Sequence, residues 1–354
     1  MTYKDLGYHS KLDAFKQENN LDAFNVGRIA LEHKERYVIK TPTSEYDAEL
    51  IGNLRFTATS RSDFPAIGDW VAFSEYDEGK ALIHAIYPRS SVIERQAVAK
   101  QGQVQIIATN IDYGIIVQAV DRDFNINRLE RYLTICHASG IHPIIVLSKI
   151  DLITGDELNT IIQKITLRIK DIPVIAISNL THDFHKLEDV IENYKTYCLL
   201  GSSGVGKSTL LNNLLGTELM KTNEISSSVN KGKHTTSHRE LIVLPNGGIL
   251  IDNPGMREIG IADTSDGLET TFESILDYAQ YCRYKDCSHI NEASCAIISA
   301  VEEGEIDEAS YNNFLKMQKE KMHFESDALE RKKKDKDLGK VIKHFKKQRK
   351  DLKF

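Results

Sequence analysis

Long apolar runs are absent from this chain of 354 residues, and cysteine is scarce. No stretch approaches the ~20 apolar residues that a helix needs to cross a membrane. Residues 1–25 are polar and lack the apolar core of a signal peptide. We therefore expect a cytoplasmic protein with no membrane partner. In a reducing cytoplasm, the five cysteines should be thiols or metal ligands and not disulfides.

Charge is distributed unevenly along the chain, although the net charge is only -6. Residues 331–354 hold 12 Lys and Arg against 3 Asp, so the rest of the chain holds 33 basic and 48 acidic residues. A basic tail on an acidic body suggests a polyanionic partner such as RNA. The alternative is a solvated, charge-rich terminal helix. The length itself predicts two or three domains.

A phosphate-binding loop with the pattern G-x-x-x-x-G-K-[ST] is the clearest motif. An apolar run at 197–200 predicts a strand before it, and residues 208–215 predict a helix after it. Backbone N–H groups at the start of that helix and the charge of Lys207 would bind phosphates, and Ser208 would place its hydroxyl on Mg²⁺. The predicted contacts are Gly201, Ser202, Ser203, Gly204, Val205, Gly206, Lys207, Ser208 and Thr209.

Further nucleotide-binding elements follow other predicted strands. The D-N-P-G segment at 252–255 would hold Mg²⁺ through its aspartate and reach the γ-phosphate through its glycine amide. The S-K-I-D segment at 148–151 resembles the N-K-x-D element of GTPases, whose aspartate pairs with guanine N1 and N2. Adenine offers no matching donors, so GTP and GDP are the expected ligands. The residues concerned are Ser148, Lys149, Asp151, Ser178, Asp252 and Gly255.

Alternating strands and helices between residues 106 and 265 predict a doubly wound α/β domain. Strands are expected at 115–120, 144–147, 174–177, 197–200, 240–244 and 248–252. The base-reading elements precede the phosphate loop here, whereas they follow it in an ordinary GTPase. The same site therefore requires a circular permutation, which is feasible because domain termini often lie close together.

The segment 232–240 contains candidates for catalysis. Met256 stands where many GTPases have a glutamine that orients the attacking water, and a thioether cannot do so. We therefore predict slow unassisted hydrolysis, with a histidine positioning water once a partner orders the segment. Alternatively, the histidines are exposed or contact a partner. The candidates are Lys207, the Mg²⁺-binding Thr235 or Thr236, and His234, with His238 second.

The N-terminal part of the chain predicts a small β barrel. Five short strands separated by turn residues are expected at 26–31, 36–40, 48–55, 69–73 and 81–87. The OB fold, a five-stranded barrel that often binds oligonucleotides, fits this pattern, although a fold alone does not assign that role. Trp70 is more consistent with the barrel core than with a base-stacking platform. Residues 96–105 are polar and predict a linker.

Near the C-terminus, three cysteines and a histidine have the spacing C-x4-C-x-H-x5-C. Three thiolates and one imidazole complete a tetrahedral shell with no position left for water, so a structural Zn²⁺ is expected. The alternative is a set of thiols without a metal. The segment has little core of its own, so loss of Zn²⁺ should unfold it. The predicted ligands are Cys282, Cys287, His289 and Cys295.

The barrel, the permuted GTPase motifs and the zinc spacing together resemble the ribosome small-subunit-dependent GTPase A family, RsgA, also called YjeQ or YloQ. The resemblance spans essentially the whole chain. It implies a bacterial GTPase, expected as a monomer, that acts late in 30S subunit maturation, binds 16S rRNA and is stimulated by the subunit. The expected domains are a polar extension (1–25), an OB barrel (26–95), a linker (96–105), the permuted GTPase (106–265), a zinc-binding helical domain (266–325) and a basic tail (326–354).

One residue departs from the family pattern. The family usually has asparagine where this chain has Ser148, and serine is too short to repeat both of the asparagine's roles, the base contact and the bracing of the neighbouring loops. We therefore expect weaker nucleotide affinity, and a divergent paralogue is an alternative identity. Two rival functions are a GTP/GDP-gated RNA-binding module with incidental turnover and a permuted P-loop NTPase that acts on another RNA complex.

Overall fold

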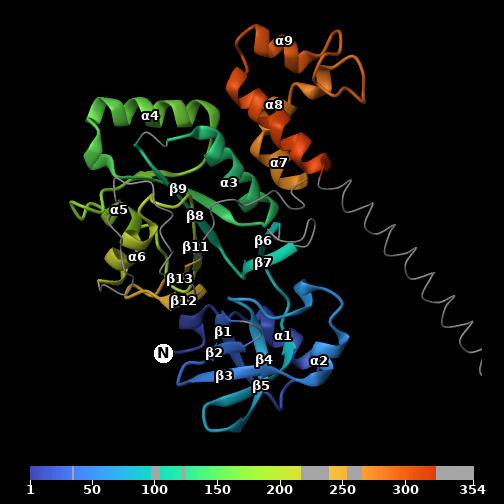
Figure 1. Ribbon diagram of the computed structural model, residues 1–354, viewed down its shortest axis with the longest axis vertical. Coiled ribbons are helices and arrows are strands. Elements are labelled where there is room, and N and C mark those ends of the chain that lie inside the picture. The colour runs from blue at the N-terminus through green and yellow to red at the C-terminus, as the bar shows by residue number, and fades with distance from the viewer. Residues whose placement is uncertain (34–35, 97–103, 122–123, 217–238, 253–264, 324–354) are drawn as a thin grey trace, which may run out of the picture.

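The computed structural model describes residues 1–33, 36–96, 104–121, 124–216, 239–252 and 265–323. Within these residues, a barrel of strands, an α/β domain and a small helical domain follow one another along the molecule (Figure 1). The barrel and the helical domain lie at opposite ends of the α/β domain. Among the described residues, no helix has the length and apolar character needed to cross a membrane.

The first strands close into a five-stranded barrel. Its elements are η1 (Lys4–Leu6), α1 (Lys11–Glu18), β1 (Asn25–His33), β2 (Arg36–Lys40), β3 (Glu45–Leu50), α2 (Gly52–Thr57), η2 (Arg61–Asp63), β4 (Trp70–Asp77) and β5 (Lys80–Ile86). The strands pair in the order β1-β2-β3-β5-β4, and β4 pairs back with β1. Ile29, Phe73 and Ile83 belong to the buried core. The predicted barrel is confirmed.

A second apolar cluster lies beside the barrel core. Leu6 and Leu12, from the predicted polar extension, are buried in it together with Trp70 and Tyr87. Trp70 is 1% exposed, so its predicted place in the core is confirmed. The first residues of the chain therefore pack on one side of the barrel.

The strand predicted at 48–55 is wrong, because β3 ends at Leu50 and the next residues form α2. The ladder between β3 and β5 ends where Leu50 pairs with Ile83. Beyond that point the backbone turns to local hydrogen bonds, such as that from the Arg55 N–H to the Ile51 carbonyl at 3.3 Å. The residue pattern of one strand does not show where its partner strand ends.

The predicted linker at 96–105 begins and ends in strands, which corrects that part of the prediction. β6 (Val92–Gln96) and β7 (Val104–Thr109) pair antiparallel in a separate two-stranded sheet. Ile93 and Ile107 are buried in the core of the α/β domain, and this packing stabilises the pairing. The middle of the predicted linker lies outside the described residues.

The central domain is a sheet covered by helices on both faces. Its strands are β8 (Tyr113–Ala119), β9 (His142–Ser148), β10 (Val174–Ala176), β11 (Thr196–Leu200), β12 (Arg239–Val243) and β13 (Ile249–Asp252). Its helices are α3 (Ile126–Ala138), η3 (Ile150–Leu152), α4 (Gly155–Arg168), α5 (His185–Glu188) and α6 (Lys207–Leu215). α3 and α4 pack into one apolar core and α5 and α6 into the other. This confirms the doubly wound α/β fold.

The order of the strands confirms the circular permutation. The sheet runs β10-β9-β8-β11-β13-β12, and its neighbours are parallel except for the antiparallel pair β12–β13. β9 and β10, which lead to the base-reading segments, precede β11, which leads to the phosphate loop. The carboxyl ends of these parallel strands meet at one edge, where open α/β sheets bind ligands.

The barrel is joined to the central sheet by main-chain and side-chain bonds. Leu31 of β1 pairs with Glu240 of β12, so strands β1–β5 of the barrel and β8–β13 of the α/β domain form one continuous sheet. The fully buried Arg28 donates hydrogen bonds to the Leu6, Gly68 and Asn110 carbonyls and to the Thr196 hydroxyl, at 2.7 to 3.1 Å. Burial lowers the pKa of Arg28 to about 10. A buried cation held by these oxygens fixes the barrel on the α/β domain.

The C-terminal domain has its own apolar core and rests on α3. Its elements are α7 (Ser265–Thr271), α8 (Glu273–Leu276), η4 (Ala279–Tyr281), α9 (Ala296–Glu302) and the helical residues 308–323. Phe272 and Phe314 are buried in this core. The buried Glu130 of α3 accepts hydrogen bonds from Arg168 of α4 and from Ser310 and Asn313 of the last helix. One satisfied carboxylate thus links the two domains.

Candidate nucleotide site and metal centre

The predicted phosphate loop connects β11 to the start of α6, as its sequence requires. Gly201 has a φ of +141°, and a β-carbon there would lie 2.3 Å from the Val117 carbonyl oxygen. Gly206 has a φ of +94° and caps the amino end of α6. Only glycine fits the first position without moving the neighbouring strand, and the second also favours glycine because of its left-handed backbone.

Lys207 lies folded back over the loop to which it belongs. Its ammonium group donates to the carbonyl oxygens of Gly201 at 2.7 Å and Ser202 at 2.6 Å. Ser208 and Thr209 are half-buried in the first turn of α6. The Lys207 ammonium and the backbone N–H groups of this first turn therefore lie together at the phosphate loop, an arrangement that binds anions.

Ser148 connects the base-reading segment to the phosphate loop. It is fully buried at the end of β9, and its hydroxyl donates to the Val205 carbonyl at 2.6 Å. Asn179 makes a second connection, because its side-chain amide donates to the Gly206 carbonyl at 3.2 Å. The serine thus retains the brace between the two segments. The serine side chain is too short, however, to contact the base as the asparagine would.

The two charged residues of the base-reading segment each have a defined partner. The Lys149 ammonium lies 2.9 Å from a carboxylate oxygen of Asp121, and the Ser178 hydroxyl donates to the Asp151 carboxylate at 2.6 Å. Sequence reasoning missed Asp121 and the bonds of Asn179. Asp121 and Asn179 each follow a strand that ends at the ligand-binding edge of the sheet, and this position in the sequence could have identified them.

The predicted Mg²⁺ ligands are only partly within the described residues. Asp252 ends β13 and is 6% exposed, and β13 pairs in parallel with β11, the strand that leads to Ser208. These two residues therefore leave neighbouring strands at the same edge. The predicted contacts of His234, Thr235, Thr236 and Gly255, and the alternative His238, lie outside the described residues.

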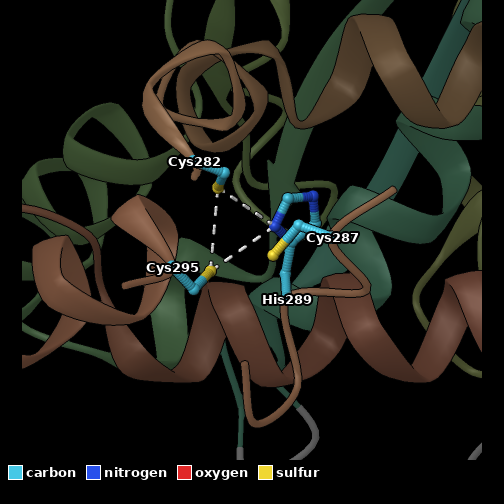
Figure 2. A group of neighbouring side chains, drawn as sticks. All are labelled: Cys282, Cys287, His289 and Cys295. Atoms are coloured by element: carbon cyan, nitrogen blue, oxygen red, sulfur yellow. Dashed lines mark hydrogen bonds between the residues drawn. The ribbon is translucent and has the colours of Figure 1, made fainter. Parts of the chain in front are cut away.

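Cys282, Cys287, His289 and Cys295 converge at one point of the helical domain, with three sulfurs and the Nδ1 atom of the imidazole facing one another (Figure 2). Their ligand atoms all lie within 4.8 Å of one another. Cys282 Sγ lies 3.8 Å from Cys295 Sγ, and these two sulfurs lie 3.6 and 3.5 Å from His289 Nδ1. The structure thus brings together all four predicted ligands.

These separations fit a tetrahedral zinc ion. Bonds of about 2.3 Å to sulfur and about 2.05 Å to nitrogen would separate two sulfurs by about 3.8 Å and sulfur from nitrogen by about 3.6 Å. The three separations given above agree with those values to within about 0.1 Å. Cys282, Cys295 and His289 therefore have the spacing that a bound metal ion requires, and the Cys287 sulfur lies within 4.8 Å of each of their ligand atoms.

The chemistry of the thiols also favours a cation. Burial disfavours the Cys282 thiolate, but hydrogen bonds from the backbone N–H groups of Ala296 and Ile297 and from the neighbouring thiols together outweigh it and lower the pKa of that thiol. Burial and the neighbouring thiols raise the pKa of Cys287 to about 11. Three thiols at this distance become thiolates together only if a cation offsets their mutual repulsion.

The loop that presents the ligands is held by its own polar groups. The Glu292 carboxylate accepts hydrogen bonds from the backbone N–H groups of Ser288 and Ile290, at 2.9 and 3.0 Å. The Tyr311 hydroxyl donates to the His289 carbonyl, which links the loop to the last helix. His289 has a φ of +61°, and these bonds support its left-handed backbone.

Comparison with known proteins identifies relatives that match nearly the whole chain. The family described as RsgA GTPase matches residues 86–262. The chain is 40% identical to the small ribosomal subunit biogenesis GTPase RsgA 2 of Listeria monocytogenes, over 97% of this chain and 96% of the relative. It is 36% identical to RsgA 1 of Bacteroides thetaiotaomicron, over the same shares of the two chains.

Solved structures show the same fold. The crystal structure of YjeQ from Thermotoga maritima matches 84% of this chain and 98% of that one, with a TM-score of 0.61 and 23% identity. The structure of YloQ, described as a circularly permuted GTPase, matches 85% of this chain and 96% of that one, with a TM-score of 0.61 and 24% identity. From the family match and the identity to relatives over almost their entire length, this chain belongs to the RsgA GTPase family.

Proposed function

We propose that this protein is a GTP hydrolase that acts in the biogenesis of the small ribosomal subunit. A relative named for that role is 40% identical over 97% of the chain. The observation that carries the proposal is the bond from the Ser148 hydroxyl to the Val205 carbonyl, at 2.6 Å. It joins the base-reading turn to the phosphate loop, so that both segments belong to one site.

In this proposal, the nucleotide lies along the carboxyl edge of the sheet. The loop from Gly201 to Ser208 surrounds the phosphates, and Lys207 supplies the positive charge that the leaving and transferred groups need. Ser208 and Asp252 hold Mg²⁺, with Thr235 or Thr236 completing its shell and the Gly255 amide at the γ-phosphate. Asp151, oriented by Ser178, reads guanine, and the stem of Lys149 lies along the base.

The attacking water needs a residue that orients it, and we propose His234 for this role. His234→Ala should lower subunit-stimulated GTP turnover by about 10²-fold, because that is the usual contribution of a group that positions or deprotonates water. GTP affinity should not change. Stimulated turnover equal to that of the unmodified protein would remove His234 from the mechanism, and the parallel variant His238→Ala then tests the second candidate.

We further propose that Cys282, Cys287, His289 and Cys295 hold one structural Zn²⁺, which leaves no coordination position for a substrate. The barrel, the helical domain and the basic residues 326–354 would contact 16S rRNA through phosphates and exposed bases. The protein would act as a cytoplasmic monomer.

Nucleotide competition tests the proposed site directly. With a fluorescent GDP analogue bound to the full-length protein, GTP and GDP should displace it at concentrations at least about 10²-fold lower than ATP or ADP, because a site built to pair with guanine leaves buried polar groups unpaired with adenine. Equal competition by ATP would contradict the guanine assignment and would favour a permuted NTPase of another specificity.

A further inference from the structure

We propose that Asp121, which belongs to none of the nucleotide-binding motifs, positions Lys149 and thereby sets the affinity for guanine nucleotides. The inference rests on the proposed nucleotide site and adds a residue to it. Asp121 follows β8, whereas Lys149 follows β9, so the pair joins two segments that the sequence separates.

The sheet places these two residues side by side. β8 and β9 are parallel neighbours, and Ala119 pairs with Ser148 at the end of the ladder. The chain continues beyond both strands at the same edge, where the Val120 N–H donates to the Ser148 carbonyl at 3.1 Å. The Lys149 ammonium then meets the Asp121 carboxylate at 2.9 Å, with the two side chains 20% and 24% exposed.

Lys149 also has an unusual backbone conformation. Its φ is +61°, a left-handed conformation that residues with a β-carbon seldom adopt. Such conformations persist where the surroundings impose them, and they concentrate at ligand sites. Ser148 is buried on one side of Lys149, and Asp121 holds the far end of its side chain. Both the main chain and the ammonium of this lysine are therefore fixed.

A lysine side chain that is already ordered loses less conformational entropy on binding a base than a mobile one does. A free lysine side chain has many conformations, and ordering it on ligand binding weakens the affinity. The ion pair with Asp121 orders the stem beforehand, at the edge where the base would lie. Because the stem lies along the flat face of the purine, it does not distinguish one exocyclic group from another. Asp151, held by Ser178, makes that distinction.

The two aspartates should therefore have separable effects on binding. Asp121→Asn should weaken the affinity for GDP and for IDP, which lacks the 2-amino group, by about tenfold each and leave their ratio unchanged. Asp121→Glu keeps the carboxylate and should restore most of the loss. Ser178→Ala loosens Asp151 and should instead reduce the preference for GDP over IDP. Calorimetric titration of each full-length protein with GDP and with IDP measures these affinities.

Asp112→Asn is the matched control, because Asp112 lies at the other end of β8 and pairs with Lys195 at 3.1 Å. It should leave nucleotide affinity unchanged. The proposal is overturned if Asp121→Asn binds GDP within twofold of the unmodified protein or more tightly, or if Asp112→Asn weakens binding equally. A failure of the unmodified protein to bind GDP would overturn the proposed nucleotide site itself, and this inference with it.

Discussion

Removal of the proposed Zn²⁺ should unfold the ligand-bearing part of the helical domain while the α/β domain keeps its fold. Apparent binding free energies of structural Zn²⁺ are about 10 to 16 kcal/mol, which is as large as the whole stability of an ordinary domain, about 5 to 15 kcal/mol. Without a cation, the three thiols and His289 form a small polar cluster next to a core that includes Phe272 and Phe314. That core is too small to hold the loop alone.

Cys295→Ser is the corresponding substitution, because Cys295 is 2% exposed and precedes α9 directly. Metal analysis should show about one zinc per chain before the substitution and little after it. Hydrogen exchange should become fast in residues 279–302, as it should after chelation, and stay slow in β11 and α6. Cys136→Ala removes a buried thiol outside the cluster and should keep the zinc. Unchanged protection of residues 279–302 without metal would contradict the structural role.

Lys207→Ala should lower GTP turnover by at least about 10³-fold, because it removes a full positive charge from the phosphates in both the ground state and the transition state. The nucleotide affinity should fall as well. The lysine ammonium also bonds to the Gly201 and Ser202 carbonyls, so the empty loop loses two internal bonds. The α/β domain itself should remain folded, since neither bond belongs to its cores.

Lys195→Ala is the control for this experiment. Lys195 immediately precedes β11, and Lys207 follows the same strand at its other end. Its ion pair with Asp112 is 43% and 35% exposed, so its loss should have little effect on stability. Turnover by Lys195→Ala should match the unmodified protein. Turnover by Lys207→Ala within tenfold of the unmodified protein would show that the loop does not bind the reacting phosphates.

The parts of this protein that depend on local sequence patterns could be predicted from the sequence. The phosphate loop, the permuted strand order and the four convergent metal ligands follow from motifs whose spacing is fixed by short-range geometry. The barrel was also predictable, because turn residues separate its short strands. The limits of its third strand were not, because β3 ends where its partner β5 stops pairing, at Leu50 opposite Ile83.

Contacts between distant segments could not be predicted in the same way. The pair Asp121–Lys149 depends on the register between β8 and β9, and the bond from Ser148 to Val205 depends on the approach of two loops. Arg28 looks like an ordinary charged strand residue in the sequence, yet it is buried between the barrel and the α/β domain. Each of these arises from tertiary packing, which no single segment encodes.

The most direct test of the central claim is GTP turnover by the purified full-length protein alone, with small ribosomal subunits and with large ribosomal subunits. We expect slow turnover by the protein alone, because Met256 cannot orient water. Small subunits alone should accelerate turnover by at least about 10²-fold. Equal turnover under the three conditions would contradict a role for hydrolysis in small-subunit biogenesis and would favour a nucleotide-gated RNA-binding module.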